Sequence, residues 1–296
     1  MTQYLSYKFN DTPDFVETFD EVPLWSASFG LLLLKHLELK PNLTVIDIGS
    51  GAGFPLMELA ERLGKSSKLY GLDPWKNACE RARRKIKNYG LSNVEIIESS
   101  AEEIPFGDDS IDLIVSNLGI NNFDQPQAVF KECQRVLKPM GKLALTTNLN
   151  GHWQEFYDIF EAKLRELGRG EITEKLTAHQ EHRGTTESIA KLFTDNGLKI
   201  RRHFEESFQM NFLDGSAFLN HHFVKLGWLS SWRDLLPPGD LEEIFSALEQ
   251  NLNAYSNKSG GLYLTVPMAF IEGEKGSNED KKNSHNIDNI NRVQFY

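Results

Sequence analysis

Residues 45–55, VIDIGSGAGFP, limit the possible fold more than any other stretch of the chain. An apolar run that carries one acid, Asp47, leads directly into three glycines at alternate positions: Gly49, Gly51 and Gly53. Glycine is required where φ must be positive or where a side chain would collide with a ligand. The stretch therefore predicts a buried strand, a tight loop and a helix, with a small ligand held close to the loop backbone.

The first half of the chain alternates short apolar runs with helical patterns. The runs expected to be strands are 43–48, 68–72, 93–97, 111–116 and 141–147. Apolar residues recur at helical spacing after Pro55, and Asp124 is expected to cap a helix that has Pro126 in its first turn. This alternation predicts an α/β fold, a doubly wound Rossmann-like sheet with right-handed crossovers.

The second half has longer elements, with helical inserts between them. Two long strands are expected at 198–212 and 261–274. The predicted organisation is a helical N-terminal cap (1–39), a ligand-binding core (40–150), a segment with the remaining core helix and terminal strands (151–275), and a flexible tail (276–296). Helical lid insertions are expected within the third segment, at about 151–183 and 214–257.

Charge, apolar content and cysteine count indicate which partners and which cell compartment to expect for this chain. The net charge is −10, whereas nucleic-acid binders are usually basic, so no nucleic-acid partner is expected. The basic run 81–87 is interpreted as the solvent-facing side of a helix. No apolar stretch reaches the roughly 20 residues that span a bilayer, so no membrane insertion is expected. With two unpaired cysteines and no secretory start, the chain is predicted to be cytoplasmic. Its oligomeric state is left open.

A second acid indicates the type of ligand. Asp73 ends the apolar run that follows the glycine loop, where a carboxylate can accept hydrogen bonds from both hydroxyls of a ribose. The glycine spacing is G-x-G-x-G, shorter than the G-x-G-x-x-G of dinucleotide sites. Together these features predict an adenosine-type ligand that needs few pyrophosphate contacts.

Five motifs in order then carry a family resemblance: VIDIGSGAG, GLDPW, SSAEEIPF, DDSIDLIVSN and VLKPMGKLALT. Over about residues 40–150 the chain resembles the class I S-adenosylmethionine-dependent methyltransferases, in the branch that contains small-molecule and quinone-ring methyltransferases. The resemblance implies S-adenosylmethionine as cofactor. It also implies a seven-stranded sheet, mostly parallel, with an antiparallel terminal strand.

The same resemblance assigns roles to individual residues. Asp47 corresponds to the acid that organises the glycine loop and the methionine amino group, and Asp73 to the ribose acid. Family members commonly have Asp where this chain has Ser100, so a hydroxyl would face the adenine amino group here. The complete implied cofactor-binding set is Asp47, Gly49, Ser50, Gly51, Gly53, Asp73, Pro74, Trp75, Ser100, Ala101, Glu102, Asn117 and Leu118.

The expected reaction is in-line transfer of a methyl group to a small acceptor of apolar or aromatic character. The extra helical segments are rich in aromatic residues, which suit such an acceptor and would equally pack the helices. The candidate acceptor-binding residues are Trp25, Asn121, Asn122 and Trp153. Candidates for a general base are His152, His221 and His222, each of which could instead be a packing or surface histidine. No metal site is expected.

Three other functions remain open from the sequence. An NAD-dependent oxidoreductase would use the same strand–loop–helix unit, although the glycine spacing argues against it. A protein that binds S-adenosylmethionine without catalysis would bind the cofactor and turn over no acceptor. A methyltransferase acting on RNA or protein would need an open or basic acceptor face.

Overall fold

The computed structural model describes residues 2–20, 24–181 and 183–277. The chain forms two compact units, which are described separately. The sheet unit comprises residues 12–147, 186–204 and 269 onward, and the helical unit comprises 1–11, 148–185 and 205–268. Nearly all of the predicted tail, from residue 278, lies outside the described residues.

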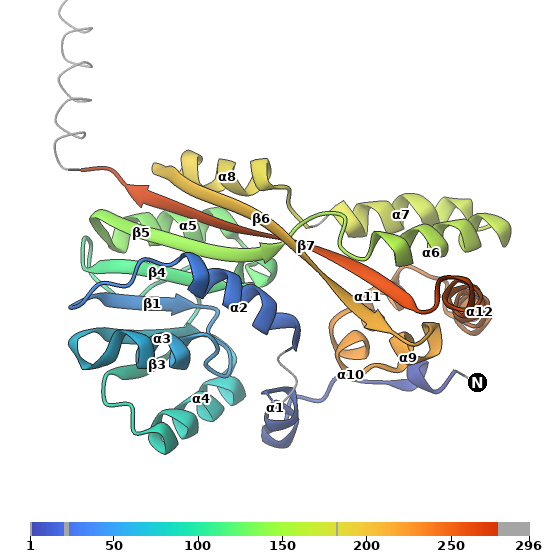
Figure 1. Ribbon diagram of the computed structural model, residues 1–296, viewed down its shortest axis with the longest axis horizontal. Helices are drawn as coiled ribbons and strands as arrows, with labels where there is room; N and C mark the ends of the chain where they lie inside the picture. Colours follow the sequence, from blue (N-terminus) through green and yellow to red (C-terminus); the bar gives the residue numbers. More distant parts are fainter. Residues whose placement is uncertain (1, 21–23, 182, 278–296) are drawn as a thin grey trace, which may run out of the picture. The chain divides into compact units, whose positions relative to one another are not determined.

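A seven-stranded sheet runs in the order β3-β2-β1-β4-β5-β7-β6 (Figure 1). Strands β1 to β5 pair in parallel, while β7 runs antiparallel between β5 and β6. This arrangement confirms the predicted fold class. The strands are β1 (Thr44–Ile48), β2 (Lys68–Asp73), β3 (Val94–Glu98), β4 (Ile111–Asn117), β5 (Leu137–Asn148), β6 (Leu198–Phe212) and β7 (Leu262–Lys275).

The helices of the sheet unit follow from local sequence signals. α4 ends at Gly90, which adopts the left-handed conformation of a helix C-cap, and Pro126 opens α5. The predicted Asp124 cap is wrong: Gln125 takes the N-cap position, and its side chain makes no capping hydrogen bond. The helices of this unit are α1 (Pro13–Asp20), α2 (Leu24–His36), α3 (Leu56–Leu63), α4 (Lys76–Tyr89), α5 (Pro126–Val136) and α8 (Thr186–Asp195).

The strand order decides where a ligand can bind. β1 and β4 are neighbours in the middle of the sheet, and the chain proceeds outward from them in opposite directions. Such a reversal leaves a crevice at the carboxyl ends of the two strands, because their connecting segments diverge. The glycine loop follows β1, and Leu118 follows β4, so both predicted site segments start at this crevice.

The helical unit has an aromatic core of its own. Trp153, Phe156, Phe160, Phe218 and Trp232 are completely buried in it, with ring centroids a few ångströms apart. Both predicted lid insertions fall in this unit. Its helices are α6 (Gln154–Glu166), α7 (Gly170–Glu181), α9 (Gly215–Asn220), α10 (His222–Val224), α11 (Ser230–Asp234) and α12 (Leu241–Ser259), with a π-helical turn η4 (Lys225–Leu229).

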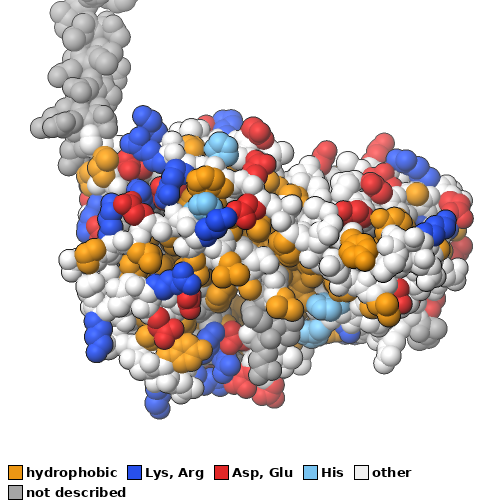
Figure 2. Space-filling model, viewed as in Figure 1, with side chains coloured by type: hydrophobic (Ala, Val, Ile, Leu, Met, Phe, Trp, Pro, Cys, Tyr) orange, Lys and Arg blue, Asp and Glu red, His pale blue; other side chains and the backbone are white. Residues whose placement is uncertain are grey.

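On the face drawn in Figure 2, Lys and Arg side chains are interspersed with Asp and Glu side chains. Among the residues that the structure describes, no helix is long and apolar enough to cross a membrane.

Candidate active site

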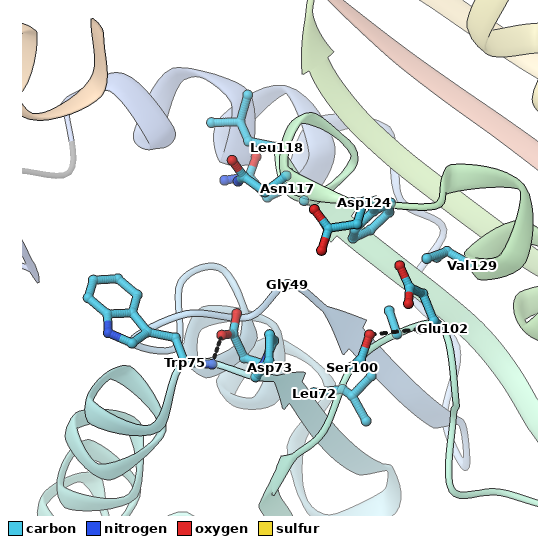
Figure 3. Close-up of a pocket in the computed structure, with 15 residues that line it drawn as sticks. Gly49, Leu72, Asp73, Trp75, Ser100, Glu102, Asn117, Leu118, Asp124 and Val129 are labelled. Carbon is cyan, nitrogen blue, oxygen red and sulfur yellow. Dashed lines mark hydrogen bonds between the residues drawn. The ribbon is translucent and has the colours of Figure 1, made fainter. Parts of the chain in front are cut away.

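A pocket of about 440 Å³ opens at the carboxyl edge of the sheet (Figure 3). Ten of its lining residues belong to the sets predicted for the cofactor and the acceptor: Gly49, Asp73, Pro74, Trp75, Ser100, Ala101, Glu102, Asn117, Leu118 and Asn122. Five others were not predicted as site residues: Leu72, Gly119, Phe123, Asp124 and Val129. Among the described residues that line it are three carboxylates, from Asp73, Glu102 and Asp124, and no Lys or Arg.

Asp73 is fixed at the end of β2 by two backbone hydrogen bonds. Its carboxylate accepts the N–H of Gly51 at 2.8 Å on one oxygen and the N–H of Trp75 at 2.8 Å on the other. Burial raises the pKa of Asp73, and these two hydrogen bonds act in the opposite direction. Since a carboxylate oxygen has two acceptor positions, each oxygen can still accept a hydroxyl from the pocket side.

The glycine loop requires glycine for different reasons at different positions. Gly49 has φ +73°, and a Cβ there would lie 3.0 Å from the Cα of Gly119. The backbones that follow β1 and β4 therefore pack directly against each other. Gly51 has φ +50°, but a Cβ there would meet no protein atom within 4 Å. At Gly53 the obstacle is the side chain of Met57.

Asp47 is a buried acid behind this loop. It is fully buried, and neither carboxylate oxygen makes a hydrogen bond of good geometry to a described residue. Burial raises the pKa of Asp47 well above its ordinary value, and the nearby Asp73 carboxylate raises it further, while the N–H of Leu56 has the opposite effect. Two buried carboxylate oxygens without hydrogen bonds destabilise the folded protein unless a ligand or a water molecule donates to them.

Replacing Asp47 by asparagine is therefore expected to stabilise the ligand-free protein while weakening cofactor binding. An unfolded Asp titrates near pH 3.8, so above that pH the folded form retains a proton that the unfolded chain has lost. The free energy of unfolding therefore declines as the pH rises from about 4 towards the raised pKa, because the folded protein binds this proton and the unfolded chain does not. Asparagine cannot ionise, so the decline should disappear.

Thermal unfolding at about pH 4, 6 and 8 measures this effect. We expect the ligand-free Asp47→Asn protein to gain in melting temperature over wild type as the pH rises. Asp195→Asn, on the exposed end of α8, is the control and should show no such trend. A melting temperature for Asp47→Asn that stays below wild type at pH 8 would contradict the assignment of Asp47 as a costly buried acid.

The end of β4 forms another wall of the pocket. Asn117 accepts a hydrogen bond from the Thr146 hydroxyl at 2.9 Å and donates one to the carbonyl of Ser26 at 3.1 Å, so its amide is held between β5 and α2. Leu118 follows with φ +67°, a conformation that leucine rarely adopts. Its N–H bonds to the carbonyl of Thr146 at 2.8 Å. Strained residues that their surroundings hold in place often mark ligand sites.

Two carboxylates lie at another wall of the pocket: Glu102, after β3, which was predicted as a cofactor-binding residue, and Asp124, after β4, which was not. Ser100 accepts the backbone N–H of Glu102 at 3.2 Å, and Glu102 accepts the N–H of Gln125 at 3.0 Å. Asp124 lies beside them with its carboxylate directed toward the pocket (Figure 3). Its position just before Pro126 is a typical helix-cap signal, which is why the sequence predicted a cap.

Trp75 is covered on one side by α1. The Phe19 ring lies 5.8 Å from the Trp75 ring. Helix α1 is joined to α4 by ion pairs from Asp20 to Arg81 and to Lys85, both at 3.0 Å. The interpretation of 81–87 as a purely solvent-facing run was therefore wrong, because part of it binds the acids of α1.

Several predicted residues lie away from this pocket's lining. Asp47, Ser50, Gly51 and Gly53 are in or behind the loop, and Trp25 is buried in α2 against Phe29. Asn121 accepts a hydrogen bond from the Thr147 hydroxyl at 2.9 Å. The remaining candidates belong to the helical unit: His152, Trp153, His221 and His222.

Comparison with known proteins identifies the class. A family model described as a methyltransferase domain matches residues 39–197, more than half of the chain. The chain therefore belongs to this family, the class I S-adenosylmethionine-dependent methyltransferases, as the sequence motifs predicted. S-adenosylmethionine is accordingly its cofactor.

Two curated relatives are demethylmenaquinone methyltransferases. The protein from Bacillus velezensis is 31% identical over 137 residues, covering 46% of this chain and 57% of the relative. The one from Listeria welshimeri is 29% identical over 184 residues, covering 59% and 78%. For several such relatives, the match spans less than three fifths of their length.

Two solved structures share the fold. A S-adenosylmethionine-dependent methyltransferase from Aquifex aeolicus superposes with a TM-score of 0.51 at 25% identity, covering 66% of this chain and 92% of its own. The YcgJ protein of Bacillus subtilis has a TM-score of 0.56 at 19% identity, covering 85% and 99%, and supports the fold alone.

Proposed function

We propose that this protein transfers the methyl group of S-adenosylmethionine to a small molecule that carries an apolar ring. The observation that carries the proposal is the pocket at the β1–β4 crevice, which combines a positive-φ glycine loop with Asp73 held by two backbone N–H groups. The charge of the pocket also suits the cofactor, because carboxylates line it and no Lys or Arg in the described part of the chain does. A cationic sulfonium suits that lining better than the diphosphate of NAD.

The residues present fit the parts of the cofactor. The free acceptor positions of Asp73 would bind the ribose hydroxyls, and the carboxylates of Glu102 and Asp124 would lie near the adenine, where Ser100 lacks one. Asp47, a buried acid without a good hydrogen bond, would be satisfied through the glycine loop by the methionine amino group, directly or through water. The open space beside Gly51 leaves room for the ligand to approach the backbone.

S-adenosylmethionine, when bound, supplies an electrophilic methyl group whose C–S bond electrons return to sulfur as the acceptor's nucleophilic atom attacks in line. The protein's task is then alignment and exclusion of water. Asn117, clamped on both sides, and the strained Leu118 give the pocket a rigid wall for this alignment. The apolar faces of Trp75, Phe123 and Val129 limit access of water.

The ring-bearing acceptor is inferred from the relatives and from the aromatic residues of this chain. Relatives of about 30% identity are named as demethylmenaquinone methyltransferases, which act on a quinone ring. Since the chain spans only part of several of these relatives, we propose the chemical class of the acceptor and not its identity.

Calorimetric titration with S-adenosylmethionine, S-adenosylhomocysteine and NAD, followed by mass spectrometry of candidate acceptors, tests the proposal. We expect micromolar binding of both sulfur ligands, none of NAD, and a gain of one methyl group on reduced quinone-type rings. Binding without transfer to any ring, RNA or protein acceptor would favour a non-catalytic role. Transfer to RNA or protein alone would overturn the small-molecule proposal.

A further inference from the structure

The three carboxylates that line the pocket differ in what they already bind. Both oxygens of Asp73 accept backbone N–H groups at 2.8 Å, and Glu102 accepts the N–H of Gln125 at 3.0 Å. Asp124, in contrast, makes no hydrogen bond or ion pair with any residue that the structure describes. Its acceptor positions are therefore available to a ligand.

The start of α5 explains why Asp124 is available. An acid just before a helix ordinarily accepts a backbone N–H of the first turn as the N-cap residue. Here Gln125 takes the N-cap position, so Asp124 lies one residue outside the helix. Figure 3 shows the Asp124 carboxylate directed toward the pocket, and the side chain is exposed, so a ligand can reach it.

Glu102 holds the backbone beside Asp124 in place. The hydroxyl of Ser100 accepts the N–H of Glu102 at 3.2 Å, which fixes the loop after β3. The Glu102 side chain then accepts the N–H of Gln125, 23 positions further along the chain. Glu102 thus ties the residue next to Asp124 to the loop after β3.

The donor groups of S-adenosylmethionine can be matched to the acids of the site one by one. The ribose hydroxyls are assigned to Asp73 and the methionine amino group to Asp47, which leaves the adenine amino group. Asp124 is the pocket carboxylate that no assigned group uses. Apolar side chains of the same pocket are suited to the flat faces of a purine: Leu72, Phe123 and Val129.

We propose that the Asp124 carboxylate accepts a hydrogen bond from the adenine amino group and makes the site selective for adenine, with Glu102 as its positioning residue. The inference rests on the cofactor site of the proposed function and adds which residue recognises the base. A purine without the amino group gives the carboxylate nothing to accept at that position. A purine with a carbonyl there presents a second acceptor, which the carboxylate repels.

Calorimetry with S-adenosylhomocysteine and its 6-deamino analogue, in which purine replaces adenine, tests the inference without depending on catalysis. We expect wild type to bind the adenine ligand about tenfold more tightly, because only the amino group forms a charge-assisted hydrogen bond. Asp124→Ala should bring the ratio of the two affinities close to one, mainly by weakening binding of the adenine ligand. Asp108→Ala, an acid that is 73% exposed and pairs with Arg135, is the matched control and should keep the wild-type ratio.

Two substitutions of Glu102 separate positioning from direct binding. Glu102→Gln keeps an oxygen that can accept the N–H of Gln125, so it should retain most of the wild-type ratio. Glu102→Ala removes this acceptor and should lower the ratio. If Glu102→Gln loses the ratio while Asp124→Ala keeps it, the inference is wrong and Glu102 recognises the base.

Thermal unfolding establishes that each variant remains folded. Equal affinity of wild type for the two ligands would overturn the inference, as would a ratio that survives Asp124→Ala. If S-adenosylhomocysteine binds to wild type no more tightly than its deamino analogue, the inference fails and the proposed function stands. If it does not bind to wild type at all, the proposed function fails and this inference fails with it.

Discussion

Alanine in place of Asp73 is expected to weaken S-adenosylhomocysteine binding by about 1–3 kcal/mol, or roughly 5- to 150-fold in Kd, because of the geometry at the end of β2. The substitution removes the acceptor for the ribose hydroxyls. It also leaves the N–H groups of Gly51 and Trp75 without the oxygens that hold them at 2.8 Å. The loss should therefore exceed that of Asp73→Asn, whose amide oxygen can still accept one N–H.

Calorimetry on both variants measures the loss, and thermal unfolding establishes that they remain folded. Asp108→Asn is the control, since that carboxylate is 73% exposed and pairs with Arg135; it should bind the ligand like wild type. A folded Asp73→Ala protein with unchanged affinity would show that the ribose does not bind at this acid.

The second large effect is expected in the glycine loop, where two substitutions should behave differently. Gly49→Ala should lose both stability and binding, because its φ is +73° and the new methyl would lie 3.0 Å from the Cα of Gly119. Gly51→Ala carries only the conformational cost of φ +50°, about 1–2 kcal/mol, since its methyl meets no protein atom within 4 Å. We expect it to fold and to bind S-adenosylhomocysteine at least roughly tenfold more weakly, a loss of about 1.4 kcal/mol.

Gly90→Ala isolates the conformational cost. Gly90 has φ +67° and equally open surroundings, but it caps the end of α4, at the opposite end of that helix from Trp75. This control should lose similar stability and retain wild-type affinity. Normal binding by Gly51→Ala would mean that the ligand does not approach the loop backbone at that position.

Much of the sheet unit could be predicted from local sequence. Apolar runs predict the strands of the first half and helical spacing predicts its helices, because each element buries one face or both against its neighbours. The order of motifs also predicted that Gly49, Asp73, Ser100 and Asn117 would lie along one edge. This follows because the carboxyl ends of parallel strands meet at the same edge of a sheet.

Other parts of the site could not be predicted because they depend on contacts between distant segments. Asp124 has the sequence context of a helix cap, and only the packing of α5 directs its carboxylate toward the pocket. The basic run of α4 resembles a solvated face until α1 brings Asp20 and Glu17 to it.

The sequence by itself determined the class of this protein, its cofactor and the edge of the sheet where that cofactor is expected. Glycine spacing, an acid at a strand end and strand–helix alternation are local signals with direct steric and hydrogen-bonding causes. Only the tertiary structure decided which buried side chains lack hydrogen-bond partners among the described residues, such as the Asp47 carboxylate behind the loop and the His152 imidazole in the helical unit. Burial and pairing are properties of the packed chain, since whether a charge is satisfied depends on what the fold places around it.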